Sequence, residues 1–279
     1  MPIESTQSVP APGSISTFEP GMVVAQRYRL GPYIDEGSYG LVFEAEDIGA
    51  TGDTEGSIAG LAVKVVPVRD PRQRQRLRRE IDVLRRLELP GVVRLHASGE
   101  IADTVFLVMD RVDGEPFPGR GRRRPWTELH PILSALLETL ERVHARGIVH
   151  RDLKPDNVLV SRSDGAPTIL DFGLSWTEAA TTRITSEGRT VGSPLYLAPE
   201  QIGSRSVDRR ADLYSIGVML FDALTGSAPF RSKDVPGLLA EKANGERVSM
   251  GALRGCAPPE IVEMIAQLLE PDPERRPGS

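Results

Sequence analysis

The chain has 279 residues, of which 39% are hydrophobic and 26% are charged, and this composition is typical of a globular protein with a substantial core. Its net charge of −5 argues against a general nucleic-acid binder. The sequence contains no run of about 18 apolar residues, so no membrane span is predicted in it. One cysteine, Cys256, and an N-terminus without a signal-peptide pattern predict a cytoplasmic location.

The first third of the chain predicts a leader followed by β structure. Residues 1–20 are rich in Pro, Ser and Thr and predict a disordered leader. YRLGPYI and GLVFEAED alternate around a glycine turn, and GLAVKVVPV is typical of a buried strand. A helix starting near Pro71 follows, and VVRLHASGE and TVFLVMDRV predict two further strands. The helix places four apolar residues on one face: Leu77, Ile81, Leu84 and Leu87.

After Arg111 the pattern changes to a mostly helical one. DGEPFPGRGRRRP is a connector without a clear helix, and its RGRRR cluster fits either an acidic partner or a solvated loop. Helices are predicted at ILSALLETLERVHA, DLYSIGVMLFDALTG, GLLAEKA and PPEIVEMIAQLLE, with short strands at VLV and TIL. The sequence therefore predicts an α+β domain over residues 28–277. A β-rich part (28–109) and a mostly helical part (113–277) meet at a joint (110–112), and the last helix is expected to be truncated.

Three polar residues in HRDLKPDNVLV (150–160) form the most specific chemical pattern of the chain. The carboxylate of Asp152 can orient a hydroxyl, Lys154 can neutralise a transferred phosphoryl group, and the amide oxygen of Asn157 can ligate Mg²⁺. Asp171, in ILDFGLS, ends a second apolar strand and supplies another metal-ligating carboxylate. Phosphoryl transfer needs mainly positioning and charge neutralisation, so this set favours that reaction.

Lys64 and Glu80 each leave two interpretations open. Lys64 lies inside the apolar stretch AVKVV, where a lysine is costly unless paired, so it either pairs with a carboxylate or extends to solvent from a strand edge. Glu80, in the following helix, is either that partner or a residue of a charged surface.

The motifs AVK, HRDLKPDN, DFG and APE (198–200), in this order, resemble those of the eukaryotic-type (Hanks-type) Ser/Thr protein kinases. VGSPLYLAPEQ is similar to bacterial members of that family, and the match runs over residues 28–277. The resemblance implies a bilobal α+β fold with a small β-rich N-lobe and a larger helical C-lobe. It also implies the use of ATP with Mg²⁺, or alternatively Mn²⁺.

The resemblance assigns roles to individual residues. It implies catalytic roles for Lys64, Glu80, Asp152 and Lys154, and metal ligation by Asn157 and Asp171. Met109 resembles the gatekeeper, and Asp110 to Val112 resemble the hinge that grips adenine. His150 is interpreted as a structural core histidine. The implied nucleotide-binding residues are Ile34, Gly37, Gly40, Val42, Ala62, Lys64, Met109, Asp110, Val112 and Leu159.

One position departs from the family pattern. Asp35 stands where the glycine-rich loop of the family has its first glycine, which helps the strand bend over the nucleotide. An acidic side chain there either repels phosphate and raises the KM for ATP, or points to solvent.

Further resemblances concern the protein substrate and regulation. GSPLYLAPE (192–200) resembles a peptide-docking segment, with Ser193 at its hydroxyl position. Asp212 resembles the buried aspartate that tethers the catalytic loop, and Arg276 the arginine that pairs with Glu200. Arg151 resembles the receptor of an activation-segment phosphate, for which Thr185 and Thr190 are the preferred candidates. The alternative is a merely soluble Ser/Thr-rich loop.

The leading hypothesis is an ATP-dependent Ser/Thr protein kinase that autophosphorylates its activation segment. The rivals are a pseudokinase or scaffold, a kinase-like regulatory module of a larger signalling protein, and a small-molecule phosphotransferase. The expected partners are a protein substrate, a second copy for trans-autophosphorylation, and further C-terminal domains outside this chain. No nucleic acid and no membrane segment are expected in this chain.

Overall fold

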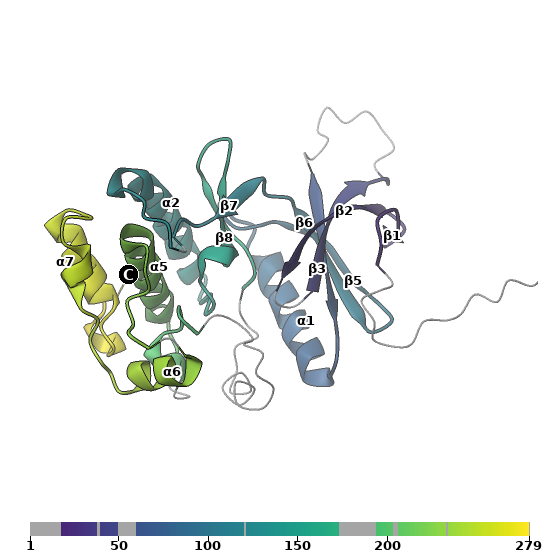
Figure 1. The fold of residues 1–279 in the computed structure, drawn as a ribbon. Helices are drawn as coiled ribbons and strands as arrows, with labels where there is room; N and C mark the ends of the chain where they lie inside the picture. The colour runs from purple at the N-terminus through teal and green to yellow at the C-terminus, as the bar shows by residue number, and fades with distance from the viewer. Residues whose placement is uncertain are drawn as a thin grey trace, which may run out of the picture. The chain divides into compact units, whose positions relative to one another are not determined.

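The computed structural model shows the chain as two compact units (Figure 1). Residues up to Ile81 and Arg94–Arg111 form the first unit, and Asp82–Val93 and the residues from Val112 onward form the second. The boundary after Arg111 falls inside the segment 110–112 that the sequence predicts as a hinge. The structure describes residues 18–37, 40–49, 60–119, 121–172, 194–202, 206–232 and 234–278.

The first unit is built on an antiparallel sheet with the order β1-β2-β3-β4-β6-β5 among the described residues. The strands are β1 (Val23–Val24), β2 (Tyr28–Gly37), β3 (Gly40–Asp47), β4 (Leu61–Pro67), β5 (Leu95–Ile101) and β6 (Thr104–Asp110). The five longer strands are those that the apolar alternation predicts. Register shifts between Leu30 and Tyr33 and between Tyr33 and Asp35 show that β2 is bulged twice against β3. Such bulges bend a strand locally.

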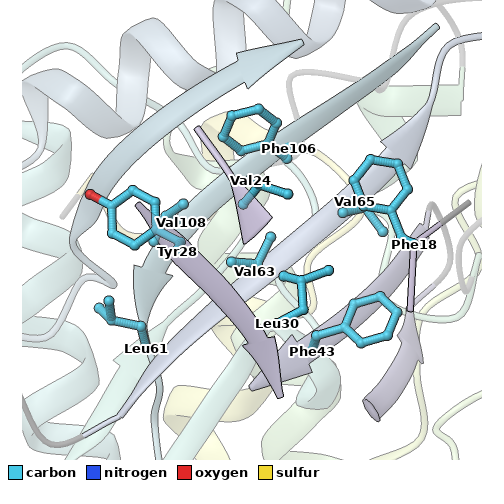
Figure 2. Packing of buried hydrophobic residues seen from close by; sticks show 10 residues of the cluster. All are labelled: Phe18, Val24, Tyr28, Leu30, Phe43, Leu61, Val63, Val65, Phe106 and Val108. Carbon is cyan, nitrogen blue, oxygen red and sulfur yellow. The ribbon is translucent and has the colours of Figure 1, made fainter. Parts of the chain in front are cut away.

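One face of this sheet carries the hydrophobic core of the unit (Figure 2). Because side chains alternate along a strand, Leu61, Val63 and Val65 of β4 point into this core while Ala62 and Lys64 lie on the opposite face. Phe18, which the sequence analysis placed in a disordered leader, is 5% exposed and packs in the core. The Pro- and Ser-rich composition of the preceding segment predicts disorder, and it gives no signal that Phe18 packs in the core. The cluster consists of Phe18, Val24, Tyr28, Leu30, Phe43, Leu61, Val63, Val65, Phe106 and Val108.

Helix α1 spans Pro71–Arg86 and confirms the predicted helix. The four apolar residues at helical spacing, Leu77, Ile81, Leu84 and Leu87, are all buried. Pro71 begins the helix, where its missing N–H has no intrahelical partner to lose.

The second unit starts with a small sheet and a long helix. The strands β7 (Gly114–Pro116), β8 (Val158–Ser161) and β9 (Pro167–Ile169) pair in this order, and a short 3₁₀ turn, η2, covers Pro155–Asn157. Helix α2 spans Trp126–His144 and begins earlier than the predicted ILSALLETLERVHA segment. Pro131 therefore lies inside the helix, where it removes one backbone hydrogen bond. Burial of Leu129, which is 0% exposed, favours the longer helix.

Helix α5 (Arg210–Thr225) is buried along almost its whole length. It ends at Gly226, whose φ of 74° is the left-handed conformation that favours glycine at a helix C-terminus. Helix α7 (Pro259–Leu268) packs against α5, and α4 (Pro199–Ile202) contacts α6 (Val235–Ala243) (Figure 1). Short turns η3 (Met250–Leu253) and η4 (Pro273–Arg275) complete this part. No helix among the described residues has the length and apolarity to cross a membrane.

Candidate active site

The loop between α2 and β8, called the catalytic loop below, brings together two predicted catalytic residues, Asp152 and Lys154, and one predicted metal ligand, Asn157. Lys154 Nζ lies 3.0 Å from Asp152 Oδ2, and Asn157 Nδ2 donates to the same oxygen at 3.1 Å and to the Asp152 carbonyl at 2.7 Å. All three side chains are buried. Both side-chain contacts of the Asp152 carboxylate among the described residues involve Oδ2, so Oδ1 remains as a further acceptor.

Asp212, at the start of α5, holds the backbone of this loop. Its side chain is 0% exposed and accepts hydrogen bonds from the backbone N–H of His150 at 2.9 Å and of Arg151 at 2.8 Å. His144 Nε2 lies 2.8 Å from the same carboxylate. Arg151 has a φ of 68°, a left-handed conformation that is strained for a residue other than glycine. The tethering role predicted for Asp212 is confirmed, and the bonds that it accepts stabilise this strained residue.

His150 is a structural residue, as the sequence analysis expects. It is 0% exposed, its Nε2 lies 3.0 Å from the Leu170 carbonyl oxygen, and its Nδ1 lies 3.3 Å from the Asp152 backbone nitrogen. The carbonyl can only accept and the N–H can only donate, so these contacts assign a neutral ring with its proton on Nε2. The ring also lies 4.8 Å from that of Phe172.

The residues on both sides of Asp171 are fixed to the catalytic loop. Leu170 N donates to the Asn157 carbonyl at 2.8 Å, and its carbonyl faces His150, against which Phe172 packs. Asp171 itself is half-buried directly after β9. The backbone thus carries the two predicted metal ligands, Asn157 and Asp171, on neighbouring segments of one unit.

In the first unit, the sheet face opposite the core gathers several predicted nucleotide-binding residues. Val42 is paired with Lys64, and Ala62 with Met109, across adjacent strands. Because directly paired residues point to the same side of a sheet, these four side chains share one face. Ile34 is 43% exposed and lies at the second bulge of β2.

Burial decides between the interpretations of Lys64 and Glu80. Lys64 is 7% exposed on β4, which lies between β3 and β6, so extension from a strand edge is excluded. Glu80 is 8% exposed on α1, so a place on the charged surface is excluded as well. Buried charges need compensation, and these two have opposite signs within one unit.

The glycine turn shows which glycine the fold itself requires. A Cβ on Gly40 would lie 1.9 Å from the Val65 carbonyl oxygen, so β4 approaches β3 too closely for any side chain there. Gly37 is paired with Gly40 across the turn. Asp35 is exposed and pairs with Val42 in a continuing strand. A bulge precedes Asp35, and bulges bend a strand locally without requiring glycine at the following residue.

The other predicted residues lie as follows. Asp110 ends β6, and its side chain contacts His96 Nε2 at 2.6 Å. Val112 begins the longer segment of the second unit, and Leu159 lies on β8 opposite Pro116 and Thr168. Thr185, Thr190 and Ser193 lie outside the described residues.

The segment after residue 193 is anchored by groups that the sequence analysis named only in part. The predicted pair of Arg276 with Glu200 is confirmed, with distances of 2.6 and 2.9 Å between buried side chains. Gln201, which was not predicted, accepts from Ala198 N at 3.0 Å and donates to the Arg151 carbonyl at 2.8 Å. It therefore joins this segment to the catalytic loop. Ser215 and Lys242, also not predicted, bind its carbonyls.

Comparison with known proteins agrees with this geometry. A family model described as "Protein kinase domain" matches residues 28–279. The chain belongs to the protein kinase family. Its α+β architecture, with a β-sheet N-lobe and a helical C-lobe, is the kinase fold that the resemblance predicted.

Several similar proteins are bacterial serine/threonine-protein kinases. PknH of Mycobacterium tuberculosis is 32% identical over 257 residues, covering 90% of this kinase chain and 40% of the relative. The DNA damage-responsive kinase RqkA of Deinococcus radiodurans is 33% identical over 267 residues, covering 93% and 39%. Pkn2 of Myxococcus xanthus is 35% identical over 219 residues, covering 74% and 26%. The chain thus spans less than half the length of these relatives, and it is a kinase domain of the bacterial Ser/Thr type.

Proposed function

We propose that the chain catalyses transfer of the γ-phosphoryl group of ATP to serine or threonine hydroxyls of proteins. The observation that carries this proposal is the convergence of Lys154 and Asn157 on one oxygen of Asp152, in a loop tethered by the buried Asp212. In the reaction, the bond from the γ-phosphorus to the ADP oxygen breaks and a bond to the hydroxyl oxygen forms. The hydroxyl proton leaves toward Asp152.

Each loop residue has a distinct part in this proposal. Asp152 Oδ1 orients the attacking hydroxyl, because its other oxygen is occupied by Lys154 and Asn157. Lys154 lies beside the position of the hydroxyl, and its cation offsets the negative charge of the phosphoryl group in transit. The left-handed Arg151 turns the chain so that its neighbour Asp152 can hold this place.

The first unit would hold the nucleotide. The sheet face that carries Val42, Ala62 and Met109 offers an apolar surface for an adenine ring, and Ile34 and Leu159 are further candidates. Lys64 would contact the α- and β-phosphates, braced by Glu80, since both are buried and opposite in charge. The backbones of Asp110 and Val112 would bind the edge of the ring. Gly37 and Gly40 would keep side chains away from the phosphates.

The residues present fit a magnesium ion. The nitrogen of the Asn157 amide is used by Asp152, so its oxygen is the atom available as a ligand, and Asp171 offers a carboxylate nearby in the chain fold. Among the described residues no cluster of three or more His, Cys, Asp or Glu could form an all-protein metal cage. Mg²⁺ suits a sparse set of hard oxygens because it retains waters and phosphate oxygens. When bound, Mg²⁺ or Mn²⁺ would neutralise phosphate charge.

The regulatory part of the proposal concerns the activation segment. Phosphorylation of Thr185 or Thr190 by a second copy of the chain would supply a dianion for Arg151. Hydrogen bonds to both the N–H and the carbonyl of Arg151 hold its backbone in place. A fixed backbone would position the guanidinium for binding the phosphate group.

The test is phosphoryl transfer by the purified, phosphatase-treated chain with ATP and Mg²⁺, read by intact mass and phosphopeptide mapping. The wild type should gain phosphates within residues 175–193 and should phosphorylate members of an arrayed library of Ser/Thr peptides. Asp152→Asn should lower the rate by about two to four orders of magnitude, because the hydroxyl loses its carboxylate. Binding of ATP by the wild type without any transfer would contradict the proposal and favour a scaffold.

A further inference from the structure

The backbone carbonyls of the segment Pro194–Leu197 are held by side chains from two helices. Lys242 Nζ, on α6, donates to the carbonyl oxygens of Pro194 at 3.1 Å, Leu195 at 2.6 Å and Leu197 at 2.6 Å. Ser215 Oγ, on α5, donates to the remaining one, that of Tyr196, at 2.8 Å. Four consecutive carbonyls thus have side-chain donors, which sets the path of the segment without any strand or helix.

Lys242 is deeply buried for a lysine. It is 2% exposed, and its Nζ lies 4.5 Å from the centre of the Phe230 ring and 5.3 Å from that of Tyr214. Taking an ammonium out of water is costly unless it is compensated. Here the compensation comes from carbonyl dipoles and aromatic faces, so the site is built around the cation.

The number of acceptors indicates the charge state. An ammonium has three N–H donors and no acceptor, whereas a neutral amine has two donors and a lone pair. Three carbonyl oxygens within hydrogen-bonding distance therefore fit the cation and would leave one carbonyl facing a lone pair in the neutral form. Burial lowers the pKa of Lys242, and the carboxylates of Glu241 and Glu200 oppose that shift only in part.

Helix α6 is itself fixed close to this lysine. The neighbouring Glu241 accepts hydrogen bonds from the backbone N–H of Arg231 and of Ser232. At the helix start, Asp234 accepts from Gly237 N at 2.8 Å and caps the first turn. The ammonium is therefore presented by a helix that is anchored at both ends, as a positioning role requires.

We propose that Lys242, together with Ser215, is a positioning residue for the protein substrate. By holding the carbonyls of residues 194–197, it shapes the surface on which the residues flanking the acceptor hydroxyl dock. The inference rests on the proposed kinase function and deepens it, since it gives a part in binding the protein substrate to a buried cation whose contacts are backbone carbonyls and aromatic rings.

The test compares steady-state kinetics of the wild type with those of Lys242→Met, Lys242→Arg and Ser215→Ala. Lys242→Met should raise the KM for the best library peptide by about tenfold or more, with the KM for ATP changed less than about twofold. Ser215→Ala should give a smaller rise, because it removes one carbonyl bond of four. Lys242→Arg should recover part of the loss, since it restores a cation with several donors.

Arg247→Met is the matched control. It removes a cation from the residues just after α6, where Arg247 is 65% exposed and paired with Glu270, and its kinetics should match those of the wild type. Hydrogen exchange of the peptide covering residues 194–202 supplies a readout without substrate. It should be faster in Lys242→Met and in Ser215→Ala, while exchange of α5 stays slow.

The outcomes separate the two proposals. An unchanged KM for peptide in both Lys242→Met and Ser215→Ala, with an active wild type, would overturn the inference. If Lys242→Met does not fold, Ser215→Ala decides the question. A wild type that phosphorylates nothing would refute the proposed function, and the exchange of residues 194–202 would then decide alone whether Lys242 anchors the segment.

Discussion

Each of two loops of the second unit is held by one buried charged side chain that binds its backbone, and the two side chains have opposite charges. The catalytic loop is fixed by an anion, Asp212, which accepts backbone N–H groups of His150 and Arg151. The segment 194–197 is fixed by a cation, Lys242, which donates to backbone carbonyls. Each charge is almost completely buried, at 0% and 2% exposure. Each loop lacks regular secondary structure over most of its length, and a buried charge replaces the missing hydrogen-bond ladder.

The comparison explains why such loops can be both irregular and defined. Buried backbone groups need partners, and a charged side chain satisfies two or three of them from one point. The two loops differ in which backbone groups the charge holds. In the first loop Asp212 holds N–H groups, while the carbonyls of Arg151 and Asp152 are bound by Gln201 and Asn157. In the segment 194–197 Lys242 holds carbonyls, and this fixes the surface that we propose for docking of a protein substrate.

The largest expected effect is a loss of stability when the buried ion pair of Arg276 and Glu200 is broken. In this pair a charge is compensated by an opposite charge, whereas in the two loops it is compensated mainly by backbone groups. Arg276 and Glu200 satisfy each other, with side chains 0% and 2% exposed. Glu200→Gln removes the negative charge and one of the two oxygens, so the guanidinium keeps one amide oxygen and the backbone carbonyls of Glu270, Arg210 and Pro271. The free energy of unfolding, measured by urea denaturation, should fall by about 3–5 kcal/mol.

The double variant Glu200→Gln/Arg276→Met sharpens that result. It removes both charges, so it should destabilise less than the sum of the two single changes. A loss below about 1 kcal/mol in Glu200→Gln would show that neutral oxygen acceptors suffice for this arginine without a carboxylate.

The second expected effect is on the catalytic loop. Asp212→Asn keeps the shape, but its amide NH₂ replaces one of the two oxygens and therefore faces either the N–H of Arg151 or the N–H of His150 together with His144 Nε2. Unfolding free energy should fall by about 3 kcal/mol, and peptide phosphorylation by about a hundredfold, because Asp152 is displaced with the loop. Asp113→Asn, in an exposed pair with Arg162, is the control and should change neither quantity measurably. Full activity in Asp212→Asn would contradict the anchoring role.

The smallest expected effect is a pH dependence of substrate docking. Burial lowers the pKa of Lys242, so it loses its proton at a lower pH than an ordinary lysine, whose pKa is about 10.4. The charged or titratable groups facing it are Glu241, Glu200 and Tyr214, and burial raises the pKa of Tyr214, which therefore stays neutral. As pH rises through the lowered pKa, the KM for peptide should rise toward that of Lys242→Met.

The pH dependence of the free energy of unfolding distinguishes weaker substrate docking from partial unfolding as the cause of a higher peptide KM. Between the lowered pKa and about 10.4, the unfolded chain holds more protons on residue 242 than the folded chain does. This group therefore makes the free energy of unfolding rise with pH in that window, while docking weakens. Lys242→Arg should show a flat peptide KM over the same range, because a guanidinium stays charged. An equal rise of the peptide KM with pH in Lys242→Arg would show that another titratable group causes the effect.

Much of the fold could be predicted from local patterns. The alternation in β2, β3 and β4 and the spacing of Leu77, Ile81, Leu84 and Leu87 determine strands and helix directly, because burial of one face drives both. Three features depend on tertiary contacts and were missed. Strand β1 has two residues, Phe18 is recruited from a polar segment, and α2 continues through Pro131 because Leu129 is buried.

The candidate site divides in the same way. Asp152, Lys154, Asn157 and Asp212 follow from motifs with fixed spacing, and the structure joins them by hydrogen bonds in and around one loop. Lys242 has no such signal, because AEKA is an ordinary stretch of a polar helix in sequence. Its role arises only where α6 meets the carbonyls of residues 194–197. Gly40 shows the converse: its motif suggests phosphate binding, yet packing against Val65 alone already requires glycine.

The most direct test of the account is hydrogen exchange measured side by side on Asp212→Asn and Lys242→Met. The account predicts faster exchange of residues 150–157 in the first variant and of residues 194–202 in the second, with the other loop unchanged in each. Equal loosening of both loops in both variants would contradict the claim that two separate buried charges hold them.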